Sequence, residues 1–186
     1  LKPQDLDAVA LSIGLGSYTG LRIGTSFAKG LCYGTDIPLI TIPKLKIIAQ
    51  TAKEKYNSED DALLCPMIDA RRMEVYCCVY NSKLNEVRAT EPQIIDENSF
   101  DDILKDKKVY FFGNGAAKCK QYITSENAIF LDEVYPLATS MIALAEDAFA
   151  KNDFADVAYF EPFYLKAAHV TVPKNQLGIR SFILKN

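Results

Sequence analysis

The order of strand-like and helix-like segments repeats along this chain, and the repeat restricts the fold more than any other feature of the sequence. The first half alternates strand, helix, strand and helix, over 7–13, 17–34, 37–42 and 43–56. The first helix begins where Ser17 or Thr19 can cap it, and the second opens with Pro43 in its first turn. A helix that joins two strands in this way implies a parallel strand pair with a right-handed crossover.

The second half starts with extra strands and then repeats the same order. Three strand-like runs, at 62–69, 74–80 and 85–90, predict an antiparallel meander. The remaining segments are a short helix from Ser99, a strand at 108–112, a helix at 116–122, a short strand at 128–131 and a helix at 137–151. The last four of these match the first half. We therefore predict an α/β fold built from two ribonuclease-H-like units, the first lacking its meander and first helix, about 50 to 60 residues at usual element lengths.

A polar run at 57–61 separates the two patterns and marks a domain boundary. We predict the remainder of an N-terminal ribonuclease-H-like subdomain at 1–58, a C-terminal ribonuclease-H-like subdomain at 59–155 and a C-terminal tail at 156–186. The tail carries Pro162 and Pro173, which favour an extended segment.

The charge balance and the cysteines exclude several classes of protein. Lys and Arg number 21 against 24 Asp and Glu, so the formal net charge is −3. A protein that binds nucleic acid unaided would carry a basic excess, because phosphate neutralisation supplies most of the affinity. The five cysteines form an odd set without a C-x-x-C pair, which is typical of reduced thiols in a cytoplasmic protein. No apolar run approaches the roughly 18 residues of a membrane span.

A glycine-rich turn at 14–24 joins the first strand to the first helix. Such a turn suits an anion, because helix-start amides and the helix dipole favour negative charge. The spacing G-x-G-x-x-x-G is one residue longer than the dinucleotide-binding fingerprint, and no G-K-S or G-K-T follows. Both the Rossmann and the P-loop interpretations therefore fail.

Gly20, Gly24 and Ala28 recur at every fourth residue of the first predicted helix. Glycine costs up to about 1 kcal/mol relative to alanine inside a helix, so two on one face indicate that something approaches closely. Packing within the chain and packing against a partner helix are both open.

Two further sets of residues have a structural and a catalytic interpretation. Asp69, followed by Arg71 and Arg72, could hold a metal or a water, but a charged turn in which Asp69 caps the backbone is favoured because metal sites normally recruit several ligands. His169 is the single histidine and lies in the tail, so it cannot build a zinc protease site that needs two or three histidines, and we expect it at the surface.

Three motifs resemble the TsaB (YeaZ) family of bacterial tRNA threonylcarbamoyladenosine biosynthesis proteins. They are GLGSYTGLRIG at 14–24, IDARRMEVY at 68–76 and EPFYLK at 161–166, and together they place the resemblance over 7–166. Leu15, Tyr18 and Lys166 depart from the family's usual Pro, Phe and Arg. The residues that carry the motifs are Gly14, Gly16, Ser17, Thr19, Asp69, Arg71, Glu74, Tyr76, Pro162 and Tyr164.

The resemblance implies an actin-like, Hsp70-like ATPase fold that has lost catalysis and holds no metal. It implies TsaD as the main partner and TsaE as a second one, a homodimer when TsaD is absent, and tRNA contact through the complex, without a membrane. It also implies no tightly bound cofactor, with ATP or ADP left for a partner interface. The surface that the family uses for TsaD and for self-association maps onto Tyr18, Gly20, Leu21, Arg22, Gly24, Thr25 and Ala28.

A nucleotide-binding enzyme of the sugar kinase and actin type is the alternative function. The glycine-rich turns at Gly14 and Gly113 favour this alternative. Such kinases need two acidic residues, however, and in this sequence only Asp69 could serve as one of them. A glycoprotease, an older label for such sequences, is disfavoured because the chain offers no protease machinery.

Overall fold

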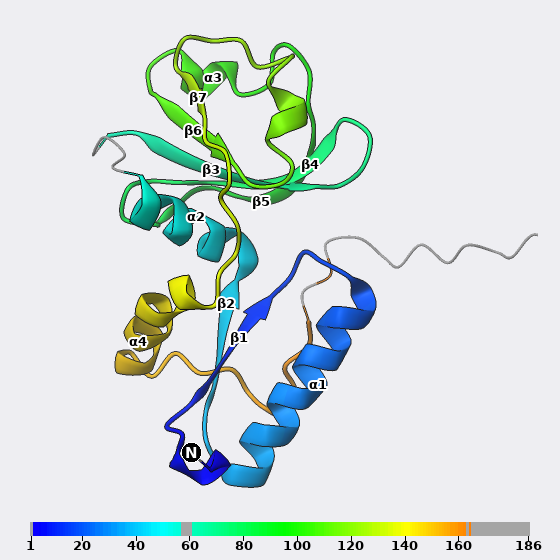
Figure 1. Cartoon of the computed structure of the whole chain (residues 1–186), viewed down its shortest axis with the longest axis vertical. Helices are drawn as coiled ribbons and strands as arrows, with labels where there is room; N and C mark the ends of the chain where they lie inside the picture. Colours follow the sequence, from blue (N-terminus) through cyan, green and yellow to red (C-terminus); the bar gives the residue numbers. More distant parts are fainter. Residues whose placement is uncertain (1, 57–60, 163, 165–186) are drawn as a thin grey trace, which may run out of the picture.

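The computed structural model describes residues 2–56, 61–162 and 164, and these form two lobes, each built on its own sheet (Figure 1). Strands β1 and β2 with helices α1 and α4 make one lobe, and strands β3 to β7 with α2 and α3 make the other. The predicted boundaries at 58/59 and 155/156 stay predictions. Within the described residues, no helix combines the length and apolarity needed to cross a membrane.

The first sheet contains β1 (Val9–Ile13) and β2 (Leu39–Pro43), which pair in parallel with Val9 opposite Leu39. Helix α1 (Tyr18–Thr35) joins them, as predicted. A short 3-10 turn at Pro3–Asp5, which the sequence did not indicate, precedes β1. The Ser17 hydroxyl caps α1 by accepting a hydrogen bond from the Gly20 amide at 3.3 Å.

The second sheet has the order β5-β4-β3-β6-β7. Its strands are β3 (Leu63–Asp69), β4 (Glu74–Tyr80), β5 (Glu86–Ile94), β6 (Val109–Phe112) and β7 (Ala128–Phe130). The first three form the predicted antiparallel meander, and β6 and β7 continue it in parallel from β3. The β1–β2 pair is parallel, as the β6–β7 pair is, and within the described residues no antiparallel meander precedes it.

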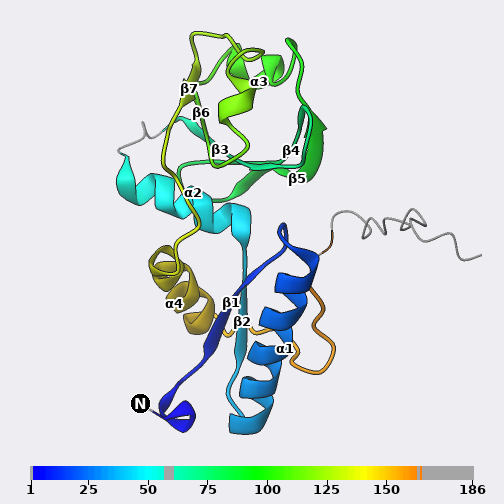
Figure 2. The same cartoon turned by 45° about the vertical axis from the view of Figure 1, so that its right-hand side comes forward.

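Two helices each pack on the sheet that the other half of the chain forms. Helix α2 (Lys44–Lys55), which follows β2, places Leu45, Ile48 and Ala52 against Leu64 and Phe112 of the second sheet. Helix α4 (Ile142–Ala150), from the far end of the chain, lies instead on the first sheet, where it packs against Ile40 and Ile42 of β2. In Figures 1 and 2, α1 and α4 flank the β1–β2 pair on opposite sides. The cross-packing fixes the two lobes to each other.

Two predicted helices are wrong in extent. The helix predicted at 116–122 is a single 3-10 turn, Ala117–Cys119. The Lys118 ammonium reaches back to the carbonyls of Arg72 and Glu74, and Ile123 turns into the core that α3 (Asp101–Leu104) shares. The helix predicted from 137 begins only at Ile142, after the 3-10 turn Thr139–Met141, where the buried Ser140 hydroxyl donates a 2.7 Å hydrogen bond to Glu54 of α2.

Candidate functional site

One side of α1 is buried inside this chain. Thr25 is 6% exposed, Ala28 3% and Cys32 1%, and Ala28 and Cys32 pack with Leu39 of β2. A side chain added at Gly24 would meet Leu11 of β1 at 3.8 Å. The residues of the small-residue stripe therefore become more buried along the helix, from the exposed Gly20 to Ala28 in the core of this chain. Intramolecular packing explains Thr25 and Ala28, so we remove both from the candidate partner surface.

The opposite side of α1 is apolar and open. Ile23 is 65% exposed and Phe27 73%, while a methyl group added at Gly30 or Gly34 would touch nothing within 4 Å. The spacing 23, 27, 30, 34 places the four residues on a single helix face, directly opposite Ala28 and Cys32. We call these four residues the outer face of α1. In the sequence, the apolar pair Ile23 and Phe27, four residues apart, indicates this face, whereas the stripe of Gly20, Gly24 and Ala28 indicates the neighbouring side of the helix.

A flank of α1 is covered by the segment that follows α4. The Tyr164 ring lies 4.8 Å from the Tyr18 ring, and the Arg22 guanidinium lies 4.3 Å from the centre of the Tyr18 ring. Arg22 Nε donates a hydrogen bond to the Tyr164 hydroxyl at 3.4 Å, and this bond raises the pKa of Arg22 above its ordinary value. The Lys29 ammonium donates to the carbonyls of Ala158 and Phe160 at 3.1 and 2.9 Å.

We call residues 156–162 with Tyr164 the strap. Figure 2 shows it crossing from α4 to α1 and running beside that helix. The strap brings Tyr164 of the third sequence motif to Tyr18 and Arg22 of the first, a contact that sequence spacing alone does not reveal. Three residues of that motif, Phe163, Leu165 and Lys166, lie outside the described residues, as does the single histidine, His169.

The glycine-rich turn before α1 connects the lobes. Gly14 and Leu15 have φ values of 76° and 30°, and the Leu15 side chain, 7% exposed, enters the core between α2 and the second sheet. The Lys44 ammonium donates a 2.8 Å hydrogen bond to the Leu15 carbonyl, and partial burial lowers the pKa of Lys44. A side chain at Gly16 would come within 2.9 Å of Lys44 Nζ. This geometry gives the turn a structural role, as an anchor between α1 and α2, with Thr19 exposed in the first turn of α1.

Asp69 at the end of β3 is engaged by a lysine that the sequence did not single out. The Lys118 ammonium donates hydrogen bonds to Asp69 Oδ1 and to the carbonyls of Arg72 and Glu74, the latter two at 2.7 Å. The Asp69 carboxylate also accepts from the Arg71 amide at 3.1 Å. The bond from Lys118 contributes most to lowering the pKa of Asp69. This arrangement matches the charged-turn interpretation of Asp69.

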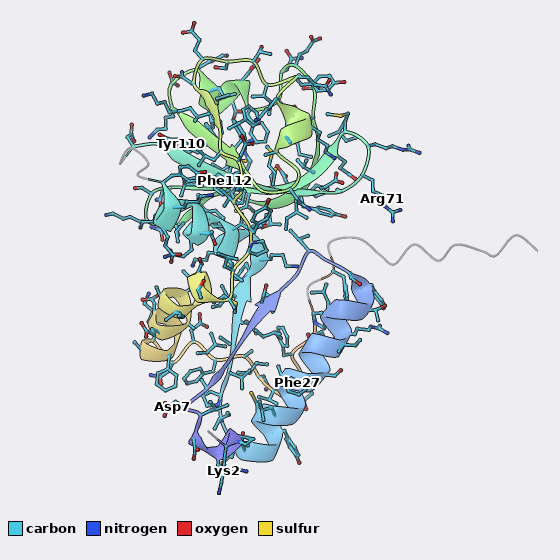
Figure 3. All side chains as sticks on the ribbon, viewed as in Figure 1. Lys2, Asp7, Phe27, Arg71, Tyr110 and Phe112 are labelled. Carbon is cyan, nitrogen blue, oxygen red and sulfur yellow. The ribbon has the colours of Figure 1, made fainter. Side chains whose placement is uncertain are left out.

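The turn between β3 and β4 projects its arginine outward. Arg71 has φ of 74° and points away from the sheet in Figure 3. Glu74 closes the turn, because its amide donates to the Arg71 carbonyl and its carbonyl accepts from the Ala70 amide, each at 3.1 Å. Tyr76, two residues further along β4, is partly buried against the core under α2. These motif residues therefore shape a hairpin.

The second glycine-rich turn, at 113–115, lies tightly against β3. A side chain at Gly113, where φ is 95°, would be 2.4 Å from the Met67 carbonyl oxygen, and one at Gly115 would be 2.9 Å from the Asp69 amide. Asn114 Oδ1 accepts a hydrogen bond from that amide at 3.1 Å. The glycines let the backbone approach the strand. Over the part of the chain that the structure describes, no three His, Cys, Asp or Glu side chains gather in a way that could hold a metal ion.

Comparison with known proteins agrees with this architecture. The family model of TsaD, described as tRNA N6-adenosine threonylcarbamoyltransferase, matches residues 1–174. The tRNA threonylcarbamoyladenosine biosynthesis protein TsaB of Haemophilus influenzae is 30% identical over 172 residues, which are 88% of this chain and 71% of that protein. TsaB of Bacillus subtilis is 34% identical over 129 residues, which are 66% of this chain and 53% of that protein.

A solved structure from Pseudomonas aeruginosa, described as an uncharacterized protein with similarity to peptidase YEAZ, superposes with a TM-score of 0.77 at 22% identity. The superposed region includes 89% of this chain and 76% of the Pseudomonas aeruginosa chain. Together, the matched family model and the superposed structure assign this mixed α/β architecture to the actin-like ATPase class of fold. Within that class, the sequence relatives show that this chain belongs to the TsaB family.

Proposed function

We propose that this protein is a non-catalytic subunit for tRNA threonylcarbamoyladenosine biosynthesis, and that it binds a TsaD protein through the outer face of α1. The main observation in support is the outer face of α1. Ile23 and Phe27 are 65% and 73% exposed there, and the neighbouring Gly30 and Gly34 leave room for a second helix. Exposed apolar side chains gathered on one helix face are typical of a protein interface. The names of the TsaB relatives supply the process.

The groups that favoured a nucleotide-binding enzyme have structural partners, which supports a non-catalytic role. The Asp69 carboxylate is engaged by Lys118, and the turn at Gly113 lies so tightly against β3 that a side chain there would be 2.4 Å from the Met67 carbonyl oxygen. We therefore propose no tightly bound cofactor, and ATP or ADP only at an interface formed with the partner. We further propose that TsaE and tRNA join through the assembled complex, because a chain of net charge −3 is a poor unaided ligand for tRNA.

In the absence of TsaD, the outer face is expected to pair two copies of this chain, since exposed apolar surface favours self-association. The five cysteines are free and buried, which supports a reducing compartment, and we propose the cytoplasm.

The test is co-purification of this protein with TsaD from the same genome. The variant Phe27→Asp places a charge in the centre of the outer face, and Val87→Asp is its matched control because Val87 is 55% exposed on β5 in the other lobe. We expect the unchanged protein and Val87→Asp to bind TsaD, and Phe27→Asp to lose binding at least a hundredfold while keeping its helical circular dichroism.

Equal binding by Phe27→Asp would remove the outer face as the interface. No binding by the unchanged protein, together with saturable ATP binding by the isolated chain, would overturn the scaffold proposal and favour the kinase-like alternative.

A further inference from the structure

The charges on α1 differ from those of the whole chain. The helix contains Arg22 and Lys29 but no Asp or Glu, although the protein as a whole has a net charge of −3. Lys29 uses its ammonium on two strap carbonyls, at 3.1 and 2.9 Å. Arg22 is exposed, and no carboxylate among the described residues forms an ion pair with it. Besides the Tyr164 hydrogen bond, the Glu161 carboxylate of the strap contributes to raising the pKa of Arg22, but no ion pair ties up the terminal guanidinium nitrogens among the described residues.

Arg22 is nevertheless held in a defined orientation. Its guanidinium lies over the Tyr18 ring at 4.3 Å, and its Nε donates to the Tyr164 hydroxyl at 3.4 Å. Only one of the five guanidinium N–H groups is used in that bond, so the terminal nitrogens are available for a bidentate carboxylate. The two tyrosines reduce the conformational entropy that Arg22 would lose on binding, because its side chain is ordered beforehand.

Arg22 also lies beside the outer face in the sequence and on the helix. It precedes Ile23 directly and sits between the outer face and the strap. Stable interfaces commonly combine an apolar centre with a polar rim, and arginine is enriched among the residues that dominate their affinity. A second copy of α1 would bring no carboxylate of its own to this position, since α1 has none.

We propose that Arg22, oriented by Tyr18 and Tyr164, is the rim anchor that receives an Asp or Glu side chain of the partner helix packed on the outer face. The inference rests on the proposed function, in which that partner is a TsaD protein, and it adds the partner's chemistry: an apolar helix stripe flanked by a carboxylate. It also gives the strap a role, because Tyr164 positions the arginine.

The experiment measures the dissociation constant of the full chain with TsaD at two ionic strengths. Arg22→Gln removes the charge, Tyr164→Phe removes only the hydroxyl, and Lys53→Gln is the matched control, an exposed cation on α2. We expect Arg22→Gln to weaken binding about ten- to a hundredfold. Tyr164→Phe should weaken it about two- to fivefold, and Lys53→Gln less than twofold. Raising the salt should weaken binding of the unchanged protein more than that of Arg22→Gln.

The outcomes separate the two proposals. If the unchanged protein binds and Arg22→Gln binds equally well, the anchor is wrong and the outer-face interface stands. If the unchanged protein does not bind TsaD, the proposed function fails and the anchor falls with it. If Arg22→Gln instead abolishes a homodimer while TsaD binding is unaffected, the anchor serves a second copy and the proposal is overturned. Circular dichroism and melting temperature, expected to match the unchanged protein, exclude loss of fold as the cause.

Discussion

Replacing Lys118 with methionine tests whether Asp69 belongs to a structural ion pair. The ammonium uses its three donors on Asp69 Oδ1 and on the carbonyls of Arg72 and Glu74. Methionine retains an unbranched side chain of similar reach, so the change removes the charge and the donors with little change in packing. The variant therefore isolates the polar contribution of Lys118.

The magnitude follows from the exposure of the groups. The Lys118 side chain is 23% exposed and that of Asp69 46%, so water can replace part of what is lost. We assign about 1 kcal/mol to the partly solvated ion pair and about 1 kcal/mol to the two carbonyls left without their donor. A loss of about 2 kcal/mol in the free energy of unfolding corresponds to about 4 to 8 °C in Tm for a chain of this size.

Urea denaturation at pH 7 measures the loss, and a double-mutant cycle with Asp69→Asn isolates the pair. We expect a coupling free energy of about 1 kcal/mol between positions 69 and 118, and unchanged binding of TsaD by both single variants. A loss below about 0.5 kcal/mol for Lys118→Met would refute the structural assignment. Loss of TsaD-dependent activity without loss of stability would return Asp69 to the list of functional groups.

Three other predictions follow from the same structure. Because the folded pKa of Asp69 is lowered, its stabilising contribution is present above the unfolded pKa of about 3.9 and is lost as the pH falls through the folded value. Asp69→Asn should therefore be less stable than the unchanged protein at pH 6, and this difference should shrink as denaturation is repeated at progressively lower pH. Gly113→Ala should lower the free energy of unfolding by about 3 kcal/mol or more, because its methyl group would lie 2.4 Å from the Met67 carbonyl oxygen at a φ of 95°. Gly34→Ala, on the open surface of α1, should instead raise the free energy of unfolding by up to about 1 kcal/mol. Equal melting temperatures of the two variants and the unchanged protein would contradict both expectations. Burial raises the pKa of Cys78 and Cys119 to about 11, so neither thiol should react with a disulfide reagent at pH 8 until the protein unfolds, and rapid labelling of the native protein would count against their burial.

Local pattern was sufficient for most of the elements. Strand-like runs at 62–69 and 74–80 predicted β3 to within one residue and β4 over its full length, and Ser17, one of the two predicted cap residues, precedes α1. The predictions were wrong where a contact from elsewhere in the chain controls the backbone. The segment at 116–122 has helix-compatible residues, yet Lys118 reaches back to the β3–β4 turn and Cys119 enters the core, so only one 3-10 turn forms.

The candidate surface shows the same limit. A repeat of small residues in a helix does not state which side faces the core, because that depends on where the sheet lies. Gly20 and Ala28 are eight residues apart, and their directions differ enough that the first is exposed and the second buried. Only the position of β1 and β2 under α1 showed that the open face is Ile23, Phe27, Gly30 and Gly34.

By itself, the sequence determined most of the element order, the parallel β1–β2 pair, the antiparallel β3–β4–β5 meander and the family, because each depends on segments that follow one another in the chain or on motifs read directly. The tertiary structure decided which helix packs on which sheet, that Lys118 engages Asp69, and that Tyr164 meets Arg22 across 142 positions of sequence. Contacts at such separations depend on the path of the whole backbone, and no local preference of the residues involved specifies them.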